Sequence, residues 1–133
     1  GPQLRGTVLV VDDHPINRKF IEILLDKMGV KVQVAEDGQQ ALDLLFAGND
    51  IDLVLMDLQM PNIDGLEATR RIRAWEAEQG RPRLPVVALT ADAFDESRLR
   101  SREAGMDAFL SKPIVPQRLR ETLERLLPAA SLL

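Results

Sequence analysis

The chain has 133 residues, with 17 basic and 21 acidic side chains and a net charge of −4. This length suits one domain, and the negative balance argues against a nucleic-acid binder that works through bulk positive charge. Without cysteine and with a single histidine, His14, disulfides, thiol catalysis and a histidine-based zinc site are excluded. No apolar run approaches the roughly 20 residues of a membrane-spanning helix.

The first half of the chain alternates between short apolar runs and amphipathic segments. A β-branched run predicts the first strand, and apolar residues at helical spacing, namely Ile16, Phe20, Ile23 and Leu24, predict the first helix. Gly29 is a typical residue for the end of that helix. In chain order, the predicted elements are strand 7–11, helix 15–28, strand 31–35, helix 38–47 and strand 51–56.

The second half continues the alternation after a turn-rich stretch at 60–65. In chain order, the predicted elements are helix 66–78, strand 85–89, helix 95–104, strand 108–110 and helix 116–127. The helix over 95–104 has only Leu99 and Ala104 as clearly apolar residues, so we expect it to bury little surface and to be a low-stability element that can shift during signalling. Arg70, Arg71 and Arg73 are predicted to form a solvated helix face.

Strands that alternate with helices of 10–15 residues predict a parallel sheet with helices on both faces. Five such units joined by right-handed crossovers fit the α/β flavodoxin-like class, a five-stranded parallel sheet in order 2-1-3-4-5 with five helices. We assign residues 7–127 to this domain and 128–133 to a tail or truncated linker. Residues 1–6 are a lead-in whose Gly1-Pro2 is typical of a protease-cleavage scar.

Polar residues stand where the predicted strands end. They are Asp12 and Asp13 after the first strand, Asp57 after the third, Thr90 after the fourth and Lys112 after the fifth. In an open α/β sheet, ligands bind outside the carboxyl ends of the strands. We therefore expect three carboxylates, one hydroxyl and one ammonium group to meet in one pocket.

This combination of groups is suited to phosphoryl transfer. Three adjacent carboxylates repel one another, and a divalent cation with a preference for oxygen ligands, such as Mg²⁺, Mn²⁺ or Ca²⁺, relieves that repulsion. Mg²⁺ uses few carboxylates and keeps coordination positions for a phosphate oxygen. Lys112 and Thr90 can then contact further phosphate oxygens, with a carboxylate as nucleophile.

Four separated motifs carry a family resemblance. They are Val10-Val11-Asp12-Asp13, Leu55-Met56-Asp57-Leu58-Gln59-Met60-Pro61 with Asp64-Gly65, Ala88-Leu89-Thr90-Ala91, and Leu110-Ser111-Lys112-Pro113. In this order, over residues 7–127, the sequence resembles the receiver domain of two-component response regulators. The resemblance implies a domain that catalyses its own phosphorylation and dephosphorylation, with a cis Lys112-Pro113 bond.

The resemblance also implies a role for each site residue. Asp57 is the phosphoacceptor, and Mg²⁺, or Mn²⁺ in its place, is held by Asp12, Asp13, the Asp57 side chain and the Gln59 backbone carbonyl. Thr90 and Lys112 contact the phosphoryl group. Thr90 and Phe109 move together on activation, although Phe109 can also be explained as a core residue.

Local patterns are similar to receivers of hybrid sensor histidine kinases. These patterns are Asn17-Arg18, Asp57-Leu58-Gln59-Met60-Pro61, Glu67-Ala68-Thr69-Arg70 and Ala104-Gly105-Met106-Asp107. That class implies a histidine kinase and a histidine-phosphotransfer domain as partners, with docking through helix 15–28. Ile16 and Phe20 are candidate contacts there, although core packing is the expected role of at least one of them. We expect a cytoplasmic domain that contacts neither nucleic acid nor membrane, in a parent chain that can be membrane-anchored.

Three other functions are compatible with parts of the pattern. A stand-alone response regulator would act on a protein target. A pseudo-receiver scaffold would lack part of the acidic set or the lysine, and all five residues are present. A phosphatase of the haloacid-dehalogenase type would carry its nucleophile on the first strand with a second aspartate two residues later. Here the first-strand acids, Asp12 and Asp13, are adjacent.

Overall fold

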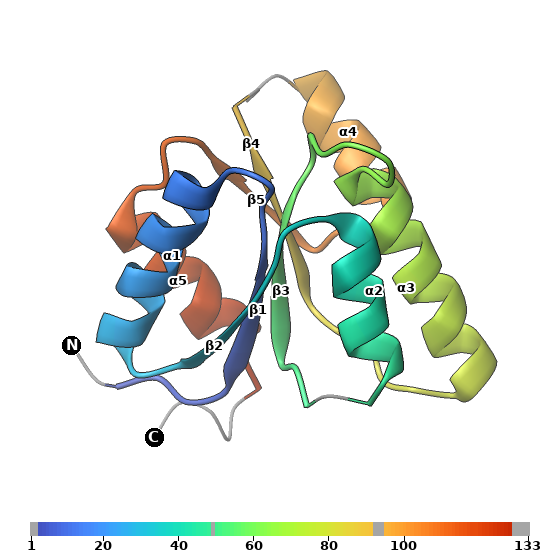
Figure 1. Ribbon diagram of the computed structural model, residues 1–133, viewed down its shortest axis with the longest axis horizontal. Coiled ribbons are helices and arrows are strands. Elements are labelled where there is room, and N and C mark those ends of the chain that lie inside the picture. Colours follow the sequence, from blue (N-terminus) through green and yellow to red (C-terminus); the bar gives the residue numbers. More distant parts are fainter. Residues whose placement is uncertain (1–2, 49, 92–94, 129–133) are drawn as a thin grey trace.

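The computed structural model describes residues 3–48, 50–91 and 95–128, which form three layers (Figure 1). The middle layer is a parallel five-stranded sheet in the order β2-β1-β3-β4-β5. Its strands are β1 (Thr7–Val11), β2 (Lys31–Ala35), β3 (Leu53–Asp57), β4 (Val86–Thr90) and β5 (Ala108–Ser111). The helices are α1 (Pro15–Met28), α2 (Gly38–Phe46), α3 (Gly65–Gln79), α4 (Asp95–Ala104) and α5 (Pro116–Leu126). The predicted fold class and strand order are confirmed.

Two strands differ at their ends from the prediction in a way that affects the site. β3 and β4 include Asp57 and Thr90 as their last residues, paired with Leu89 and Ser111 respectively. These polar groups are therefore fixed by the sheet ladder and not by a loop. At its other end β3 starts later than predicted, because Asp52 is bonded to Thr7: its amide donates to the Thr7 carbonyl at 2.8 Å and its Oδ2 accepts from the Thr7 amide at 2.8 Å.

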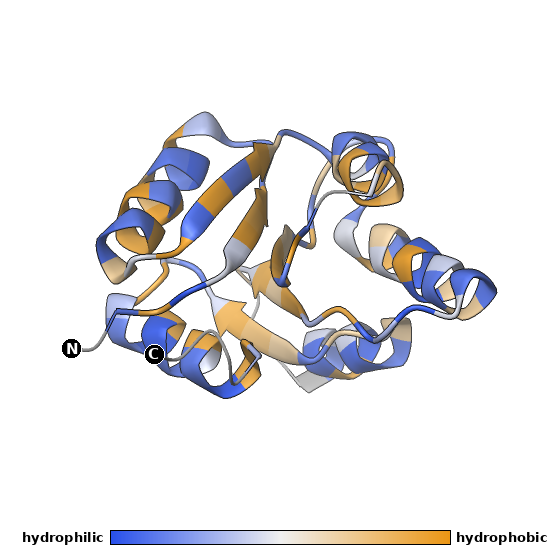
Figure 2. Cartoon of the chain, turned by 90° about the horizontal axis from the view of Figure 1, so that it is seen from below, coloured by the Kyte–Doolittle hydropathy of each residue, from blue (hydrophilic) through white to orange (hydrophobic). Residues whose placement is uncertain are grey.

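Both faces of the sheet are covered, so the central strands β1, β3 and β4 are apolar apart from a terminal residue in each, namely Thr7, Asp57 and Thr90 (Figure 2). Successive residues point to opposite faces, which divides the core into two clusters. The cluster under α1 and α5 includes Val8, Val10, Leu55, Leu25 and Leu119. The cluster under α2 and α3 includes Leu9, Val11, Met56, Leu42 and Ile72. Leu4, ahead of β1, is also buried in the first cluster.

Helix α1 has the predicted bounds, but the expectation that at least one of Ile16 and Phe20 packs in the core was wrong. The buried residues are Ile21, Leu25 and Met28, whereas Ile16 is 74% exposed and Phe20 is 45% exposed. The helix carries apolar side chains on more than one stripe, and spacing alone cannot decide which stripe faces the sheet. An apolar strip of α1 is therefore left at the surface.

Side-chain caps start three helices at the carboxyl edge of the sheet. The His14 Nδ1 accepts from the Asn17 amide at the start of α1, Asp37 Oδ1 accepts from the Gln40 amide at α2, and Asp64 Oδ1 accepts from the Glu67 amide at α3. These caps set the direction in which the chain leaves β1, β2 and the loop after β3. Among the described residues, no helix has both the length and the apolar character that crossing a bilayer requires.

Candidate functional site

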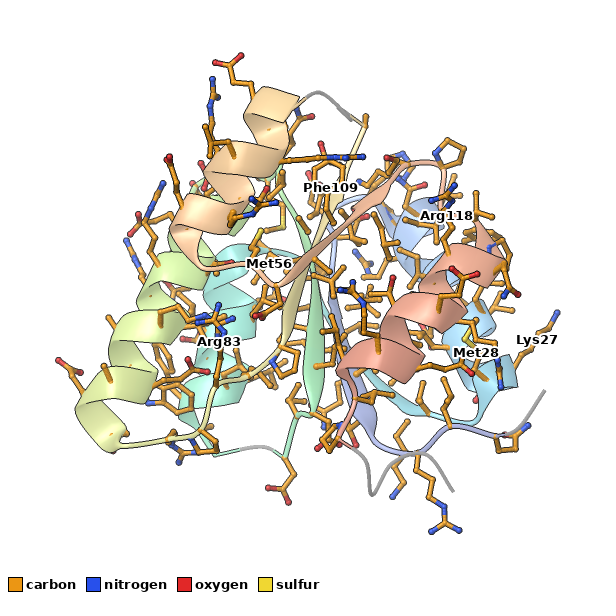
Figure 3. The ribbon with its side chains drawn as sticks, turned by 180° about the vertical axis from the view of Figure 1, so that it is seen from behind. Lys27, Met28, Met56, Arg83, Phe109 and Arg118 are labelled. Atoms are coloured by element: carbon orange, nitrogen blue, oxygen red, sulfur yellow. The ribbon has the colours of Figure 1, made fainter. Side chains whose placement is uncertain are left out.

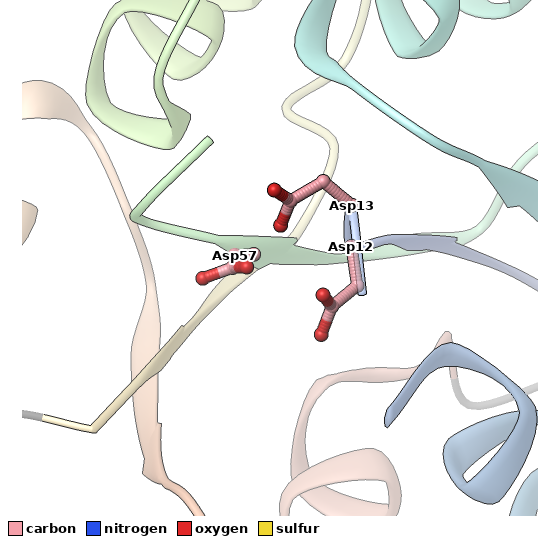
Figure 4. A group of neighbouring side chains, drawn as sticks. All are labelled: Asp12, Asp13 and Asp57. Atoms are coloured by element: carbon pink, nitrogen blue, oxygen red, sulfur yellow. The ribbon is translucent and has the colours of Figure 1, made fainter. Parts of the chain in front are cut away.

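Three carboxylates meet at the carboxyl edge of the sheet, as the sequence predicts (Figure 4). Asp12 and Asp13 follow β1, and Asp57 ends the neighbouring strand β3. One carboxylate oxygen from each lies within 4.8 Å of the others. Asp12 and Asp57 are buried, whereas Asp13 is exposed at the mouth of the site. The fold thus brings together residues that are 44 positions apart in the chain.

Lys112 supplies the positive charge inside this group. Its Nζ lies 3.3 Å from Asp12 Oδ2 and 3.2 Å from Asp57 Oδ2. The Lys112 amide donates to the Thr90 carbonyl at 2.7 Å, and the Lys112-Pro113 peptide bond is cis, as the family resemblance implies. A single ammonium group therefore faces two buried carboxylates, so the pocket keeps an excess of negative charge.

The hydrogen bonds of the two buried carboxylates leave one oxygen without a donor. Asp12 Oδ1 accepts from the His14 amide at 2.9 Å, and Asp57 Oδ1 accepts from the Gln59 amide at 3.1 Å. Asp12 Oδ2 is buried and accepts no hydrogen bond from the described residues, with the Lys112 ammonium as its charge partner at 3.3 Å. A buried carboxylate oxygen in that state is suited to bind a hard cation.

Burial raises the pKa of the Asp57 carboxyl above its ordinary value, because the charged form loses hydration inside the protein. The amide of Gln59 and the ammonium of Lys112 pull the pKa down, and the neighbouring charge of Asp12 pushes it up. The desolvation of the carboxylate is the largest of these effects. A second positive charge in the pocket would favour the ionised form of Asp57 that a nucleophile requires.

The remaining predicted residues surround the carboxylates at different depths. Thr90 is buried at the end of β4, next to β3. Gln59 is exposed just after β3, with its amide turned toward Asp57. Phe109 is half-buried on β5, opposite Ala88 in the sheet, and the Arg98 guanidinium lies 5.1 Å from its ring centre. The coupled movement predicted for Thr90 and Phe109 stays a prediction.

Gly65 allows the chain to return closely over the phosphoacceptor position. A Cβ atom at Gly65 would collide with the backbone carbonyl of Asp57, and the Gly65 amide donates to the Leu58 carbonyl at 3.3 Å. The first turn of α3 therefore packs directly against the end of β3. The Asp64-Gly65 pair was recognised in the sequence as part of a motif, but this backbone contact follows from the tertiary structure.

Arg18 supports the acidic loop in a way that the sequence did not predict. Its Nη1 donates to the Asp12 backbone carbonyl at 2.8 Å, and its Nη2 lies 3.8 Å from Glu36 Oε1 after β2. The side chain ties α1, the loop after β1 and the end of β2 together. Residues Asp12 and Arg18 are six positions apart, a spacing that indicates no contact within a helix.

The prediction that Arg73 lies on a solvated helix face was wrong. Its side chain is 15% exposed and donates to Glu76, Asp107 and the carbonyls of Leu84 and Gly105. This cluster fixes the end of α3 to the starts of β4 and β5. Arg70 and Arg71 are exposed, as predicted, and pair with Glu67 of the same helix.

Comparison with known proteins places these features in a family. Residues 8–124 match the model of the response regulator receiver domain. Sensor protein GacS of Pseudomonas syringae pv. syringae is 44% identical over 126 residues, and sensor histidine kinase RcsC of Escherichia coli strain K12 is 45% identical over 116 residues. These alignments cover 92% and 87% of this chain, but 14% and 12% of those proteins.

Solved structures agree with the sequence comparison. The receiver domain of a Pseudomonas aeruginosa sensor histidine kinase, with a magnesium ion coordinated in its active-site cleft, has a TM-score of 0.80 and 37% identity, and the match covers 91% of this chain and 96% of that one. The receiver domain of Saccharomyces cerevisiae Ssk1, in complex with the histidine phosphotransfer protein Ypd1, matches with a TM-score of 0.91 and 26% identity, over 100% and 96% of the chains.

The chain belongs to the response regulator receiver domain family. Its relatives include receivers of hybrid sensor histidine kinases. It is a phosphoacceptor domain of two-component signalling, with the acidic triad typical of the receiver magnesium site.

Proposed function

We propose that this receiver accepts a phosphoryl group on Asp57 from a phosphohistidine of a kinase and passes it to a histidine-phosphotransfer domain. The single observation that carries the proposal is the group of Asp12, Asp13 and Asp57, with their oxygens within 4.8 Å, next to Lys112. The adjacent acids Asp12 and Asp13 after β1, with Asp57 on β3, do not have the placement expected of a haloacid-dehalogenase phosphatase.

In the proposed step, a carboxylate oxygen of Asp57 attacks the phosphorus of the phosphohistidine. A P–O bond forms, the P–N bond breaks, and the released imidazole nitrogen keeps the electron pair and takes up a proton. Lys112 turns from Asp57 Oδ2 toward the negatively charged phosphoryl oxygens. Thr90, at the end of β4, donates its hydroxyl hydrogen to another of them.

Asp12, Asp13, the Asp57 side chain and the Gln59 backbone carbonyl would hold Mg²⁺, with Mn²⁺ as an alternative. The buried Asp12 Oδ2, which has no hydrogen-bond donor among the described residues, supports this assignment. When bound, the ion offsets negative charge between the carboxylates and the incoming phosphoryl group.

The first test is intact mass spectrometry after incubation with acetyl phosphate and Mg²⁺. We expect one added phosphoryl group on the wild type, none with a chelator, and none on Asp57→Asn. Labelling of Asp57→Asn at the wild-type level would overturn the assignment of the phosphoacceptor.

Thr90→Ala should still be labelled, but amide shifts around Phe109 on addition of beryllofluoride should be reduced.

The relay is tested separately at α1. Its exposed apolar strip, with Ile16 and Phe20, is the docking site we propose for a histidine-phosphotransfer domain. Ile16→Glu should slow phosphotransfer to such a domain about tenfold while labelling by acetyl phosphate is unchanged. The matched control is Leu99→Glu, which places the same charge at an exposed leucine of α4. Equal transfer rates for the two variants would contradict docking at α1.

The alternative is a stand-alone response regulator that controls a protein target. It predicts that the phosphorylated domain loses its label by hydrolysis alone in the presence of a panel of histidine-phosphotransfer domains. Rapid transfer to one member of the panel supports the relay.

A further inference from the structure

A hollow of about 270 Å³ lies at the edge of the sheet where β3 and β4 begin, opposite the edge that carries Asp57. Its wall comes from the ends of α2 and α3, the start of β3 and the segment between α3 and β4. The apolar side chains that line it include Leu45, Ile51, Trp75 and Leu84. Figure 3 shows Arg83, in the same wall, well below Phe109 on β5. Since an apolar cavity of about 150 Å³ holds a benzene ring, this hollow has room for one aromatic ring with a short side chain.

The segment between α3 and β4 forms a fixed wall of this hollow. The Arg81 amide donates to the Glu76 carbonyl at 3.0 Å, and the Leu84 amide donates to Glu76 Oε2 at 2.6 Å. Pro82 and Pro85, which also line the hollow, restrict the backbone between these bonds. A site whose wall is already ordered loses little conformational entropy when a ligand binds.

Arg81 brings to the hollow a positive charge that is available to a ligand. Its guanidinium lies 4.5 Å from the centre of the Trp75 ring, and the Phe46 ring lies 4.9 Å from that of Trp75. Among the described residues, no carboxylate forms an ion pair with Arg81. The other arginine of the wall, Arg83, pairs with Asp107 at 2.9 Å.

Two carboxylates line the hollow, and both accept hydrogen bonds from the protein. Glu76 is buried and accepts from Arg73 and from the Leu84 amide. Asp52 Oδ2 accepts from the Thr7 amide at 2.8 Å. These bonds hold the two carboxylates in place, so a ligand with its own carboxylate is expected to direct it toward Arg81 and away from Asp52.

We propose that this hollow binds a small aromatic carboxylate, whose ring packs against Trp75 and Leu45 and whose carboxylate pairs with Arg81. A guanidinium that stacks on an aromatic ring keeps its N–H groups in its own plane, so Arg81 can donate two parallel hydrogen bonds without leaving Trp75. The small volume favours a single-ring compound over a nucleotide. The hollow shares no residue with the Asp57 site or the α1 strip, so the inference goes beyond the proposed function and does not depend on it.

Trp75 provides the measurement, because it is the only tryptophan of the chain. Its fluorescence and its single indole N–H signal in NMR both report on this hollow. The probe is hydrocinnamate, which does not absorb where tryptophan is excited selectively. We expect a saturable change in both signals, with a dissociation constant on the order of 1 mM for a compound with so few atoms. Hydrocinnamyl alcohol, which has the same ring without the carboxylate, should bind at least tenfold more weakly.

A pair of variants tests the role of Arg81. Arg81→Gln removes the guanidinium and should weaken hydrocinnamate binding at least tenfold. The matched control, Arg70→Gln, removes an exposed arginine of α3 that does not line the hollow and should change the affinity less than twofold. Trp75 is retained in both variants, so the same two signals are read.

Amide shifts of the wild-type protein during the same titration provide a reading that needs no variant. They should move at the end of α2 and over residues 75–85, and stay fixed around Asp57 and Lys112. No saturable change at tens of millimolar probe, equal weakening by the two variants, or shifts that map elsewhere would overturn the proposal. Equal affinity for the alcohol would overturn the choice of an anion. Pro128 also lines the hollow, so binding that appears only after removal of residues 129–133 would overturn the proposal in favour of the chain's own C-terminal segment.

Discussion

At the scale of single residues, two buried groups of charges are balanced in different ways. Around Arg73, the carboxylates of Glu76 and Asp107 accept hydrogen bonds from guanidinium and backbone donors. Around Asp57, a single ammonium group faces two carboxylates, and Asp12 Oδ2 has no donor among the described residues. A fully bonded cluster stabilises the fold, whereas an incompletely balanced one is available to bind a ligand.

We expect Arg73→Met to lower the free energy of unfolding by about 3 kcal/mol, because it leaves the buried carboxylate of Glu76 without its cation and removes one of the two arginines that pair with Asp107. Urea unfolding of the purified domain measures this change. The control is Arg71→Met, which removes an exposed pair with Glu67 in the same helix and should cost less than about 0.5 kcal/mol. Similar costs for the two variants would mean that the Arg73 cluster contributes no more than a surface ion pair.

The raised pKa of Asp57 predicts how stability depends on pH in the presence of a chelator. The folded protein keeps the Asp57 proton to a higher pH than the unfolded chain, whose carboxyl titrates near 3.8. The contribution of Asp57 to the free energy of unfolding therefore falls as the pH rises from 3.8 through the raised pKa that the group has in the folded protein. Asp57→Asn should be more stable than the wild type at pH 7, and this advantage should vanish below pH 3.8.

Thermal melts of both proteins from pH 3 to 8 test this expectation. A wild type that is more stable than Asp57→Asn at pH 7 without divalent cations would show that the ion pair with Lys112 outweighs the desolvation of Asp57.

At the scale of elements, α4 differs from the other helices in how little it buries. Among the α4 side chains that the structure describes, Ser101 and Ala104 are buried, while Leu99 is 54% exposed. Its carboxyl end is held through Gly105, whose carbonyl accepts from Arg73 and Arg83. The sequence-based prediction of a helix over 95–104 that buries little surface is confirmed in its bounds and its burial. Its role as a moving element stays a prediction.

We expect the amides of α4 to exchange with solvent at least tenfold faster than those of α5, because a helix with little buried apolar surface opens at a lower free-energy cost. Hydrogen exchange followed by NMR at pH 7 measures both helices in one sample. α5 is the internal control, since Leu119 and Leu123 are fully buried. Equal protection in the two helices would exclude local instability of α4.

At the scale of the whole molecule, the position of the acidic site would couple the proposed metal binding to folding. Its carboxylates lie just after β1 and at the end of β3, so the complete site exists only when the sheet has formed. A ligand that binds the folded state alone raises the free energy of unfolding. A metal held between these strands therefore stabilises the entire domain.

We expect Mg²⁺ at ten times its dissociation constant to add about 1.4 kcal/mol to the free energy of unfolding. Thermal melts with increasing MgCl₂, compared with equal ionic strength from NaCl, measure this effect. Asp12→Asn should reduce the shift to the level of the NaCl control. A Mg²⁺-dependent shift that is unchanged in Asp12→Asn would place the ion elsewhere on the protein.

The sequence by itself determined the order of the elements and grouped Asp12, Asp13, Asp57 and Lys112 in one predicted site. Alternating apolar segments identified the parallel sheet, because strand and helix have different periods that remain visible in one sequence. Asp12, Asp13, Asp57, Thr90 and Lys112 could be grouped because the carboxyl ends of parallel strands lie at one edge. Bounds were off by one or two residues in places, since hydrogen bonds such as those between Asp52 and Thr7 set them.

Only the tertiary structure decided which residues of each helix are buried and which are exposed. The core position expected for Ile16 or Phe20 and the solvated position expected for Arg73 were both wrong, because neither helical spacing nor residue type specifies which stripe meets the sheet or which distant carboxylate lies beside a cation. The contacts of Arg18 with Asp12 and of Gly65 with Asp57 likewise depend on how loops fold back over strand ends. Such contacts join residues with no regular spacing in the chain, and only the packing of whole elements brings them together.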